Sequence, residues 1–327
     1  MNGYINVTRG NTVESVHRVH VAVVGAQGEL VACVGDAQRT GFLRSAAKPW
    51  QALPLVEDGV ADAFGFTEAE LALCCASHNT EPGHLAGARS ILAKIGLDEG
   101  ALECGPHFPI SESVTRELLS GGVTFGPIHN NCSGKHAGML ALAIHHGWTP
   151  AGYLAADHPV QRRMAEEVVR WTGLKAEEIP TAVDGCGVPT YSVPMSGLAQ
   201  GFARFAAHGG GPARVVRAMT REPFMIAGTG RLCTDLMSIA GGTLYCKTGA
   251  EGVYAAAAVD GRYGVGIKVE DGARRASEAA LLRVLAELEM IDEVQIERLS
   301  DYIRAPVRDT LGDMVGEVRP EFELEWI

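Results

Sequence analysis

Short apolar runs rich in β-branched residues occur near both ends of the chain, and this arrangement constrains the fold more than any other feature. Near the start, residues 19–24 (VHVAVV) and 30–35 (LVACVG) are joined by GAQGE, a pattern typical of an antiparallel hairpin. Near the end, three further runs predict short strands: residues 243–249, 252–261 and 263–272. Because strands must pair to satisfy their backbone groups, we expect both chain ends to contribute to one antiparallel sheet.

The long segment between these strands is predicted to be mostly helical. Four stretches have the apolar spacing of helices: residues 67–77, 83–96, 134–147 and 159–173. Thr67 and Glu70 form a capping-box pattern at the start of the first stretch. Another helix is predicted after the last strand, over residues 274–290.

These elements predict an α/β protein of the α+β type, in which one antiparallel sheet from both chain ends carries flanking helices and a helical middle. We expect residues 1–327 to form a single unit, with a helical subdomain that fits within about residues 65–240. The glycine-rich segment 206–212 resembles a linker, but a segment this short does not define a domain boundary.

Charge and composition argue against several classes of function. The formal net charge of −11 opposes binding to nucleic acid and to anionic membranes, and no run of Lys or Arg offsets it. The sequence has no apolar window long enough for a spanning helix, and its opening lacks the apolar region of a secretory signal. Eight cysteines in a chain of this kind are not expected to form a disulfide framework. We therefore expect a cytoplasmic protein.

The stretch RSAAKPW, residues 44–50, places Ser45 and Lys48 three residues apart. In a helix these positions share one face, so the two side chains lie within hydrogen-bond reach. A serine hydroxyl becomes a good nucleophile when a base takes its proton, and a lysine is such a base only when it is neutral. Arg44 is near enough to favour that neutral form. The alternative is that two polar residues simply begin a helix.

Two later stretches strengthen the catalytic interpretation. Ser77-His78-Asn79 follows an apolar helical run, and Lys247 begins a Lys-Thr-Gly sequence that closes an apolar strand. The order Ser-x-x-Lys, Ser-x-Asn, Lys-Thr-Gly is the signature of serine β-lactamases and penicillin-binding proteins. The alternative interpretation is a helix cap for each serine and an exposed strand end for Lys247.

A third set of residues has the chemistry of a metal site. Cys132 and Lys135 are three residues apart at a glycine-bearing helix start, and Cys186 stands between two glycines. Two thiolates with a nitrogen donor can hold zinc in a tetrahedral site. Lysine is an unusual ligand because its amine must first lose a proton, and His136 is the more ordinary donor nearby. Two unconnected loop cysteines are the alternative.

At these residues the chain resembles the asparaginase II family, the rhizobial-type L-asparaginases. The resemblance covers nearly the whole sequence and rests on LRSAAKPWQALPLVEDG, CCASHNTEPGH, HNNCSGKHAGML, DGCGVPTY and CKTGAEGVY. It implies a serine β-lactamase-like fold, a homodimer, and hydrolysis of L-asparagine to L-aspartate and ammonia.

The resemblance also implies roles for particular residues. Ser45 with Lys48 matches the first of two Ser–Lys pairs, and Ser77 with Lys247 matches the second. A zinc ion is implied on two cysteines and a lysine, which fall on Cys132, Lys135 and Cys186. Arg44 and Asp184 match residues of the same pocket.

From these roles we expect a mechanism that passes through an acyl-enzyme. Ser45 attacks the side-chain amide carbon of asparagine while neutral Lys48 takes its proton, and ammonia leaves. Water then hydrolyses the ester, with Ser77 and Lys247 shuttling protons. Two thiolates already neutralise much of the charge of a zinc ion, so we expect the metal to position groups rather than to activate water.

The neighbouring polar residues are assigned to substrate binding, with some roles left open. Arg44 either favours the neutral form of Lys48 or grips a substrate carboxylate. Asp184 either binds the ammonium group of the substrate or orders the metal shell. Asn79 and His136 complete the predicted substrate-binding set.

Two other functions are compatible with parts of the pattern. One is a different serine hydrolase of the same fold, which hydrolysis of nitrocefin but not asparagine would identify. The other is a non-catalytic amino-acid-binding protein, which asparagine binding without ammonia release would identify. Two intact Ser–Lys pairs argue against the second, because a protein that only binds has no use for a neutral lysine.

Overall fold

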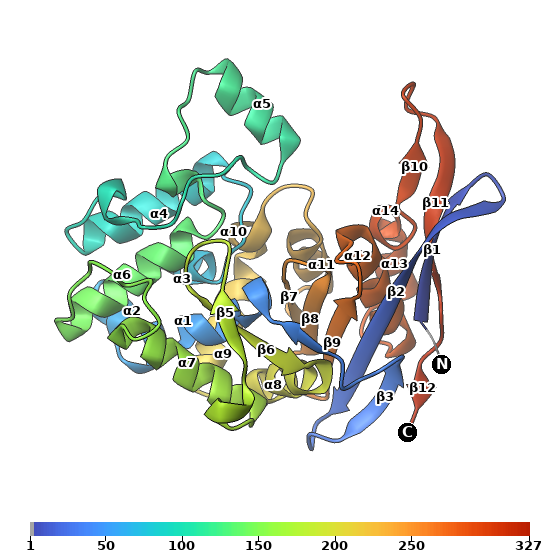
Figure 1. The fold of residues 1–327 in the computed structure, drawn as a ribbon, viewed down its shortest axis with the longest axis horizontal. Helices are drawn as coiled ribbons and strands as arrows, with labels where there is room; N and C mark the ends of the chain where they lie inside the picture. The colour runs from blue at the N-terminus through green and yellow to red at the C-terminus, as the bar shows by residue number, and fades with distance from the viewer. Residues whose placement is uncertain (1–2) are drawn as a thin grey trace.

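The computed structural model describes residues 3–327 and shows a mixed α/β architecture built on a large, curled antiparallel sheet (Figure 1). The strands of this sheet are β1 (Gly3–Arg9), β2 (Thr12–Gly25), β3 (Leu30–Val34), β7 (Leu244–Thr248), β8 (Val253–Ala258), β9 (Tyr263–Val269), β10 (Pro306–Arg308), β11 (Met314–Glu321) and β12 (Glu325–Trp326). Their main order is β10-β11-β1-β2-β9-β8-β7, while β3 pairs with both β2 and β12.

The two ends of the chain meet where β2 pairs with β9. The pairing is antiparallel and places Val21 opposite Ile267 and Val23 opposite Val265. All four side chains are fully buried. Branched side chains of this kind pack well on a pleated surface, which stabilises a pairing between segments so distant in sequence. The predicted single sheet built from both chain ends is confirmed.

Two helices cover the centre of the sheet, α8 (Met195–Ala207) and α12 (Arg274–Glu287). Gly264 and Gly266 lie on the face of β9 that meets α8, where a Cβ atom would fall 2.1 Å and 2.4 Å from the helix backbone. Because side chains alternate along a strand, the buried Val265 and Ile267 face the other side, where α12 packs. The sheet is therefore enclosed on both faces at its centre.

The remaining helices gather mainly beside the sheet (Figure 1). Their bounds are α1 (Lys48–Glu57), α2 (Val60–Ala63), α3 (Glu68–Cys74), α4 (Pro82–Lys94), α5 (Glu112–Ser120), α6 (Ser133–His146), α7 (Pro159–Thr172), α9 (Gly211–Arg221), α10 (Pro223–Ala227), α11 (Leu232–Ala240), α13 (Glu293–Arg298) and α14 (Ser300–Ile303). Helix α1 packs against α6, α7 and α9 and so lies at the centre of this group. A small second sheet, of order β4-β6-β5, consists of β4 (Thr40–Phe42), β5 (Thr181–Val183) and β6 (Pro189–Pro194).

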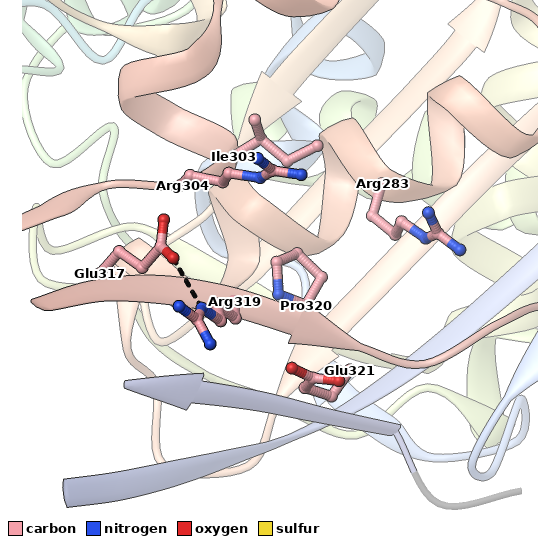
Figure 2. Close-up of a pocket in the computed structure, with 7 residues that line it drawn as sticks. All are labelled: Arg283, Ile303, Arg304, Glu317, Arg319, Pro320 and Glu321. Atoms are coloured by element: carbon pink, nitrogen blue, oxygen red, sulfur yellow. Dashed lines mark hydrogen bonds and ion pairs between the residues drawn. The ribbon is translucent and has the colours of Figure 1, made fainter. Parts of the chain in front are cut away.

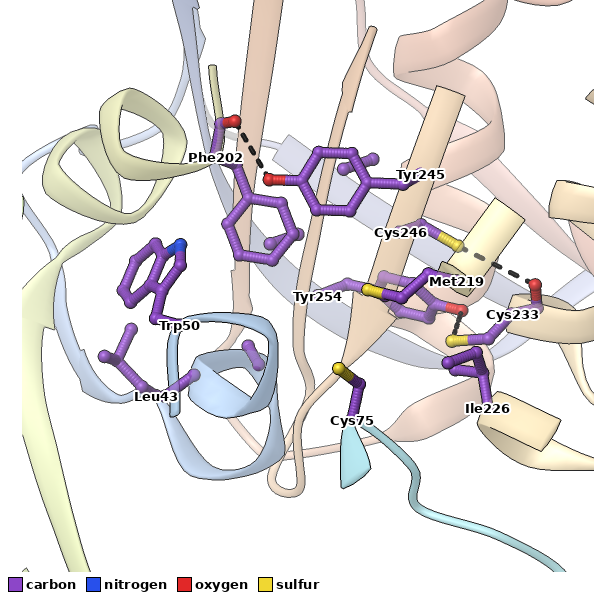
Figure 3. Close-up of a cluster of buried hydrophobic side chains, with 14 of the residues drawn as sticks. Leu43, Trp50, Cys75, Phe202, Met219, Ile226, Cys233, Tyr245, Cys246 and Tyr254 are labelled. Atoms are coloured by element: carbon purple, nitrogen blue, oxygen red, sulfur yellow. Dashed lines mark hydrogen bonds between the residues drawn. The ribbon is translucent and has the colours of Figure 1, made fainter. Parts of the chain in front are cut away.

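An aromatic core joins the helical group to the sheet (Figure 3). Phe202 of α8 stacks on Tyr245 of β7 with 5.0 Å between ring centroids, and Trp50 of α1 meets Phe202 edge-on at 5.6 Å. The Tyr245 hydroxyl donates a hydrogen bond to the Phe202 carbonyl at 2.9 Å, which satisfies the polar end of a buried ring. This core fixes the positions of α1 and β7, the two elements that carry Lys48 and Lys247.

Most elements expected from the sequence are present. The hairpin of residues 19–24 and 30–35 lies in β2 and β3, and the three later runs form β7, β8 and β9. The helices predicted over 67–77, 83–96, 134–147, 159–173 and 274–290 correspond to α3, α4, α6, α7 and α12. Thr67 and Glu70 form the predicted capping box at α3. The small second sheet, the strands β1, β10, β11 and β12, and the helices α2, α5, α8, α9, α10, α11, α13 and α14 were not predicted individually.

No helix within residues 3–327 combines the length and the apolar character that crossing a membrane requires.

Candidate active site

The Ser77 hydroxyl lies between two buried lysine amines. Lys48 Nζ lies 2.9 Å from Ser77 Oγ, and Lys247 Nζ lies 3.0 Å from the same oxygen. The two lysines are 1% and 0% exposed, and Ser77 is 4% exposed. An amine buried to this degree is costly unless it has hydrogen-bonding partners, so the serine and the lysines stabilise one another's positions.

Three different elements bring these groups together. Lys48 is the first residue of α1, where Pro49 fits because the amide hydrogen it lacks would have no helical partner there. Ser77 follows α3 in a segment without regular secondary structure, and its backbone amide donates to the Ile226 carbonyl at 2.9 Å. Lys247 lies in β7, whose five residues are all buried. Packing of α1, α3 and β7 therefore determines the geometry of the cluster.

The surroundings of Lys247 favour its neutral form. Burial lowers the pKa of Lys247 to about 7, and the nearby amine of Lys48 and guanidinium of Arg231 act in the same direction. A substantial fraction of this amine is therefore unprotonated at neutral pH, which a general base requires. Lys48 has two further contacts, the Ala76 carbonyl and Cys132 Sγ, the latter at 3.1 Å.

Ser45 lies in a short 3-10 helix, η1 (Arg44–Ala47), directly before α1. It is half-buried, and no described residue hydrogen-bonds its hydroxyl. Arg44 has a φ of +49°, in the left-handed region that residues with a Cβ seldom adopt. Its Nε donates to Asp184 Oδ1 at 2.7 Å, an ion pair that holds η1 against the β5–β6 hairpin.

Ser45 and Ser77 open into the same pocket, which has a volume of about 160 Å³. Its lining also includes Asn131, Arg231 and the Gly249 segment that follows Lys247 and Thr248. Residues from η1, from the loop after α3 and from the end of β7 thus meet around one cavity. The Ser-x-x-Lys and Ser-x-Asn stretches and the Lys-Thr-Gly stretch, which are far apart in sequence, are brought together at this site.

Cys132, Lys135 and Cys186 form a second buried cluster that touches the first through Lys48. Lys135 Nζ lies 3.2 Å from Cys186 Sγ, and the three residues are 5%, 3% and 6% exposed. A hydrogen bond from the Cys186 thiol and the positive charges of Lys48 and Lys135 lower the pKa of Cys132 well below its usual range. The cluster therefore favours a thiolate.

The donor set of this cluster is chemically suited to zinc, since two sulfurs and one amine nitrogen converge in a buried space. Within residues 3–327, no group of three or more His, Cys, Asp or Glu side chains is placed to hold a metal ion. A third protein ligand would accordingly have to be Lys135. His136, the alternative donor from sequence, is fully buried with its Nδ1 2.8 Å from the Tyr153 hydroxyl.

Asp184 and Cys186 reach the site from the β5–β6 hairpin. The Asp184 amide donates to the Val188 carbonyl at 2.8 Å, and the Gly187 amide donates to the Asp184 carbonyl at 2.9 Å, which closes a tight turn. Burial would raise the pKa of Asp184, but the charges of Lys135 and Arg44 outweigh it and lower this pKa. Asp184 is therefore ionised, and it connects the cluster of Cys132, Lys135 and Cys186 to η1.

Asn79 is fully buried and faces an arginine that sequence reasoning missed. Its Oδ1 accepts a hydrogen bond from Arg231 Nη1 at 2.8 Å, and its Nδ2 donates to the Thr229 carbonyl at 3.0 Å. Arg231 is the one charged residue between Glu222 and Asp235 in the sequence. A single charge within an apolar stretch was the available signal, because buried arginines are rare without a specific partner.

A larger pocket of about 360 Å³ lies elsewhere, against β11 and the helices α12 and α14 (Figure 2). Its lining includes Arg283, Arg304 and Arg319, and Arg319 is paired with Glu317 at 2.6 Å. None of the Ser–Lys or thiol residues lines it, and Arg304 and Arg319 are exposed. The smaller pocket beside Ser77 is the candidate active site.

The mixed α/β fold thus places a serine and two buried lysines beside a pocket. The chain belongs to the L-asparaginase II family, whose family model matches residues 5–320. The match spans nearly the whole chain.

Comparisons with individual proteins add less. A search of curated proteins gave no match. Among solved structures, the chain is similar to Mglu in its native form in 4.3 M NaCl, with 16% identity, a TM-score of 0.40, and coverage of 85% of this chain and 63% of that one. A second Mglu structure, in its L-glutamate binding form, matches with 17% identity, a TM-score of 0.39, and coverage of 85% and 62%. The chain thus spans less than two thirds of either relative.

Proposed function

We propose that this protein hydrolyses the side-chain amide of L-asparagine, releasing L-aspartate and ammonia through an acyl-enzyme. One observation carries the proposal: Ser77 Oγ is hydrogen-bonded to both Lys48 and Lys247 beside a pocket that also contains Ser45. Membership of the L-asparaginase II family supports the substrate class. The pocket volume of about 160 Å³ suits a small amino acid.

Ser45 is the proposed nucleophile. It is more exposed than Ser77, it lines the pocket, and its hydroxyl is not already engaged by two amines. Attack forms a bond from Ser45 Oγ to the amide carbon, and the serine proton passes to the Lys48, Ser77 and Lys247 network. The network returns a proton to the amide nitrogen, the carbon–nitrogen bond breaks, and ammonia leaves.

Deacylation reverses the direction of proton transfer. Water attacks the ester carbon, its proton enters the same network, and the bond to Ser45 Oγ breaks as that oxygen is reprotonated. Neutral Lys247 is suited to accept the proton because its pKa is about 7. Ser77 would serve as the bridge, since its hydroxyl contacts both amines.

Ser77 is the competing nucleophile, and its two hydrogen bonds favour that alternative. Trapping the acyl-enzyme by rapid acid quench, followed by peptide mass spectrometry, separates the two assignments. If the trapped acyl group were found on Ser77, the roles of the two serines would be exchanged and the overall reaction would stay the same.

The proposal extends to the fold and to zinc. Convergence of the Ser-x-x-Lys, Ser-x-Asn and Lys-Thr-Gly stretches on one pocket supports a serine β-lactamase-like arrangement. Cys132, Lys135 and Cys186 would hold the zinc ion, which when bound supplies a fixed positive charge. The chain's own contribution is structural: Cys132 contacts Lys48, and Asp184 ties the cluster to Arg44.

The experiment that tests this function is an ammonia-release assay with L-asparagine, L-glutamine and short amides, run with and without a chelator. We expect ammonia from L-asparagine, and we expect Ser45→Ala to lower turnover by at least about 10³-fold while the fold survives. Near-normal activity in that variant would remove Ser45 from the nucleophile's role. Hydrolysis of nitrocefin alone would replace the proposed function with that of another serine hydrolase, and asparagine binding without ammonia would indicate a binding protein.

A further inference from the structure

Arg231 is a buried cation that lines the candidate active site. It is 6% exposed and lies directly before α11, in the loop that connects α10 to this helix. Its Nη1 donates to Asn79 Oδ1 at 2.8 Å and to the Ser77 carbonyl at 3.3 Å, and these contacts leave Nε and Nη2 available. The guanidinium is therefore bound to the backbone of Ser77 and lines the same pocket as Ser45 and Ser77.

The guanidinium of Arg231 is hydrogen-bonded to neutral acceptors, and no carboxylate is paired with it directly among residues 3–327. The acceptors are Asn79 Oδ1 and the Ser77 carbonyl. Burial is the largest influence on its pKa, which is lowered from the usual arginine value although the nearby Cys233 and Glu278 act in the opposite direction. A buried guanidinium without a directly paired carboxylate is costly, which is typical of a group that receives an anionic ligand.

The other cations around the pocket differ from Arg231 in this respect. Arg44 is paired with Asp184 at 2.7 Å, and Arg274, which also lines the pocket, is paired with Glu278 at 3.4 Å. The Arg274 side chain is 54% exposed, so solvent screens its charge. The pocket carries one carboxylate, Glu251, which is exposed and forms no ion pair with either arginine.

We propose that Arg231 binds the α-carboxylate of the substrate and thereby restricts the enzyme to side-chain amides of amino acids with a free α-carboxyl group. The inference rests on the proposed function and identifies the substrate class of the same site. A guanidinium presents a planar fork of donors that matches a carboxylate, which favours two parallel hydrogen bonds. Arg231 is the N-cap residue of α11, so the partial positive charge of that helix N-terminus lies beside it.

This assignment also gives Asn79 a positioning role. The Asn79 amide accepts from Arg231 on one side and donates to the Thr229 carbonyl on the other, so it fixes the orientation of the guanidinium. Arg44, already paired with Asp184, is left to shape η1 rather than to grip the substrate carboxylate.

The test compares two substrates in each protein. L-asparagine and its α-amide, L-aspartic acid diamide, share the ammonium group and the side-chain amide but differ in the α-carboxylate. We expect Arg231→Gln to lower kcat/KM for L-asparagine by about 10²-fold and to change kcat/KM for the diamide by less than about 3-fold. The ratio of the two values in one protein is independent of the fraction that is folded, so a poorly folding variant remains informative.

Matched variants complete the experiment. Arg304→Gln, at an exposed arginine of the pocket in Figure 2, should leave the ratio unchanged. An equal loss for both substrates in Arg231→Gln would show a merely structural role and overturn the proposal. If Arg274→Gln, rather than Arg231→Gln, lowered the ratio of the two kcat/KM values, the proposal would be overturned as well. Arg231→Lys, which keeps the charge without the fork, should recover part of the ratio.

A binding measurement separates failure of this inference from failure of the proposed function. Calorimetry compares L-aspartate with L-isoasparagine, in which the α-carboxylate is replaced by an amide. We expect L-aspartate to bind the wild-type protein at least about 10-fold more tightly, and we expect this preference to vanish in Arg231→Gln. If asparagine releases no ammonia while this preference holds, the hydrolysis proposal fails and the Arg231 assignment stands. Equal binding of both probes by the wild type would overturn the assignment.

Discussion

Lys247 makes the proposed catalysis sensitive to pH near neutrality. Its amine is fully buried, and burial lowers its pKa to about 7. Because the pKa is lowered, the neutral form is the minor one below pH 7 and the major one above it. A base that must be neutral therefore gains activity as pH rises through this value.

We predict that kcat/KM for L-asparagine rises with pH through an apparent pKa of about 7. Initial rates of ammonia release between about pH 5 and pH 9 provide the measurement. Lys247→Arg keeps a permanent charge and should lower the rate at every pH by at least about 10²-fold. A profile that is flat across this range, or one that rises only near the ordinary lysine pKa, would contradict the role of Lys247 as a base.

At the scale of residues, the sequence identified the polar groups of the site better than their partners. The three-residue spacing of Ser45 and Lys48 suggested a local pair, whereas the Lys48 amine is hydrogen-bonded to Ser77. Spacing along a helix restricts which face a side chain occupies, but packing of distant elements decides what that face meets. Arg231 was missed for the same reason, since only the folded chain shows that it lines the pocket.

At the scale of elements, two segments position the cluster of Cys132, Lys135 and Cys186. The first turn of α6 places Lys135 one turn after Cys132, and the β5–β6 hairpin presents Cys186 opposite them. Since Cys132 Sγ also lies 3.1 Å from Lys48 Nζ, the cluster supports the amine that faces Ser77. Loss of one thiol should therefore affect substrate positioning more than it affects the rate of the chemical step.

We predict that Cys132→Ala raises the KM for L-asparagine more than it lowers kcat, and that protein purified without chelators contains about one zinc ion per chain. Steady-state kinetics and elemental analysis measure the two effects. Cys33→Ala is the matched control, because Cys33 lies in β3 where that strand pairs with β12. Metal-free protein, or a variant in which kcat alone falls, would argue against a positioning role for the cluster.

Apolar runs and several helices with clear apolar spacing were predicted, whereas strands with a weak pattern were not. Helices such as α6 and α7 show helical apolar spacing and end at glycines in the left-handed region, Gly147 and Gly173. Strand β5 is fully exposed, and β11 alternates only weakly between exposed and buried positions. Such strands form because a neighbouring strand offers hydrogen bonds, and their own sequence carries little of that information.

At the scale of the whole molecule, the fold depends on contacts between segments that are far apart in sequence. Strand β2 near the start pairs with β9 near the end, and α8 from the middle packs across both. The sequence predicted that both ends share a sheet, because apolar runs occur at both ends. It did not predict the strand order or the register. Many pairings would bury the same valines and isoleucines, and only packing against the assembled helices selects one pairing.

Gly266 shows how tightly this assembly is packed. A Cβ atom at this position would lie 2.4 Å from the Met195 carbonyl oxygen in the first turn of α8, and 3.2 Å from the Ala199 amide nitrogen. Both neighbours are backbone atoms, so the clash cannot be relieved by a change of rotamer. Helix α8 would have to move away from the sheet, and the contact between Phe202 and Tyr245 would loosen with it.

We predict that Gly266→Ala lowers the free energy of unfolding by about 1–3 kcal/mol or more, because overpacking against backbone forces a shift of a whole element. Urea denaturation followed by tryptophan fluorescence measures the change. Gly105→Ala is the matched control, since a Cβ there meets nothing within 4 Å, and its stability should stay within about 0.5 kcal/mol of the wild type. Equal stability of the two variants would mean that α8 can move off β9 without a free-energy cost. Close packing of α8 on the sheet would then not be what fixes the positions of β7 and Lys247.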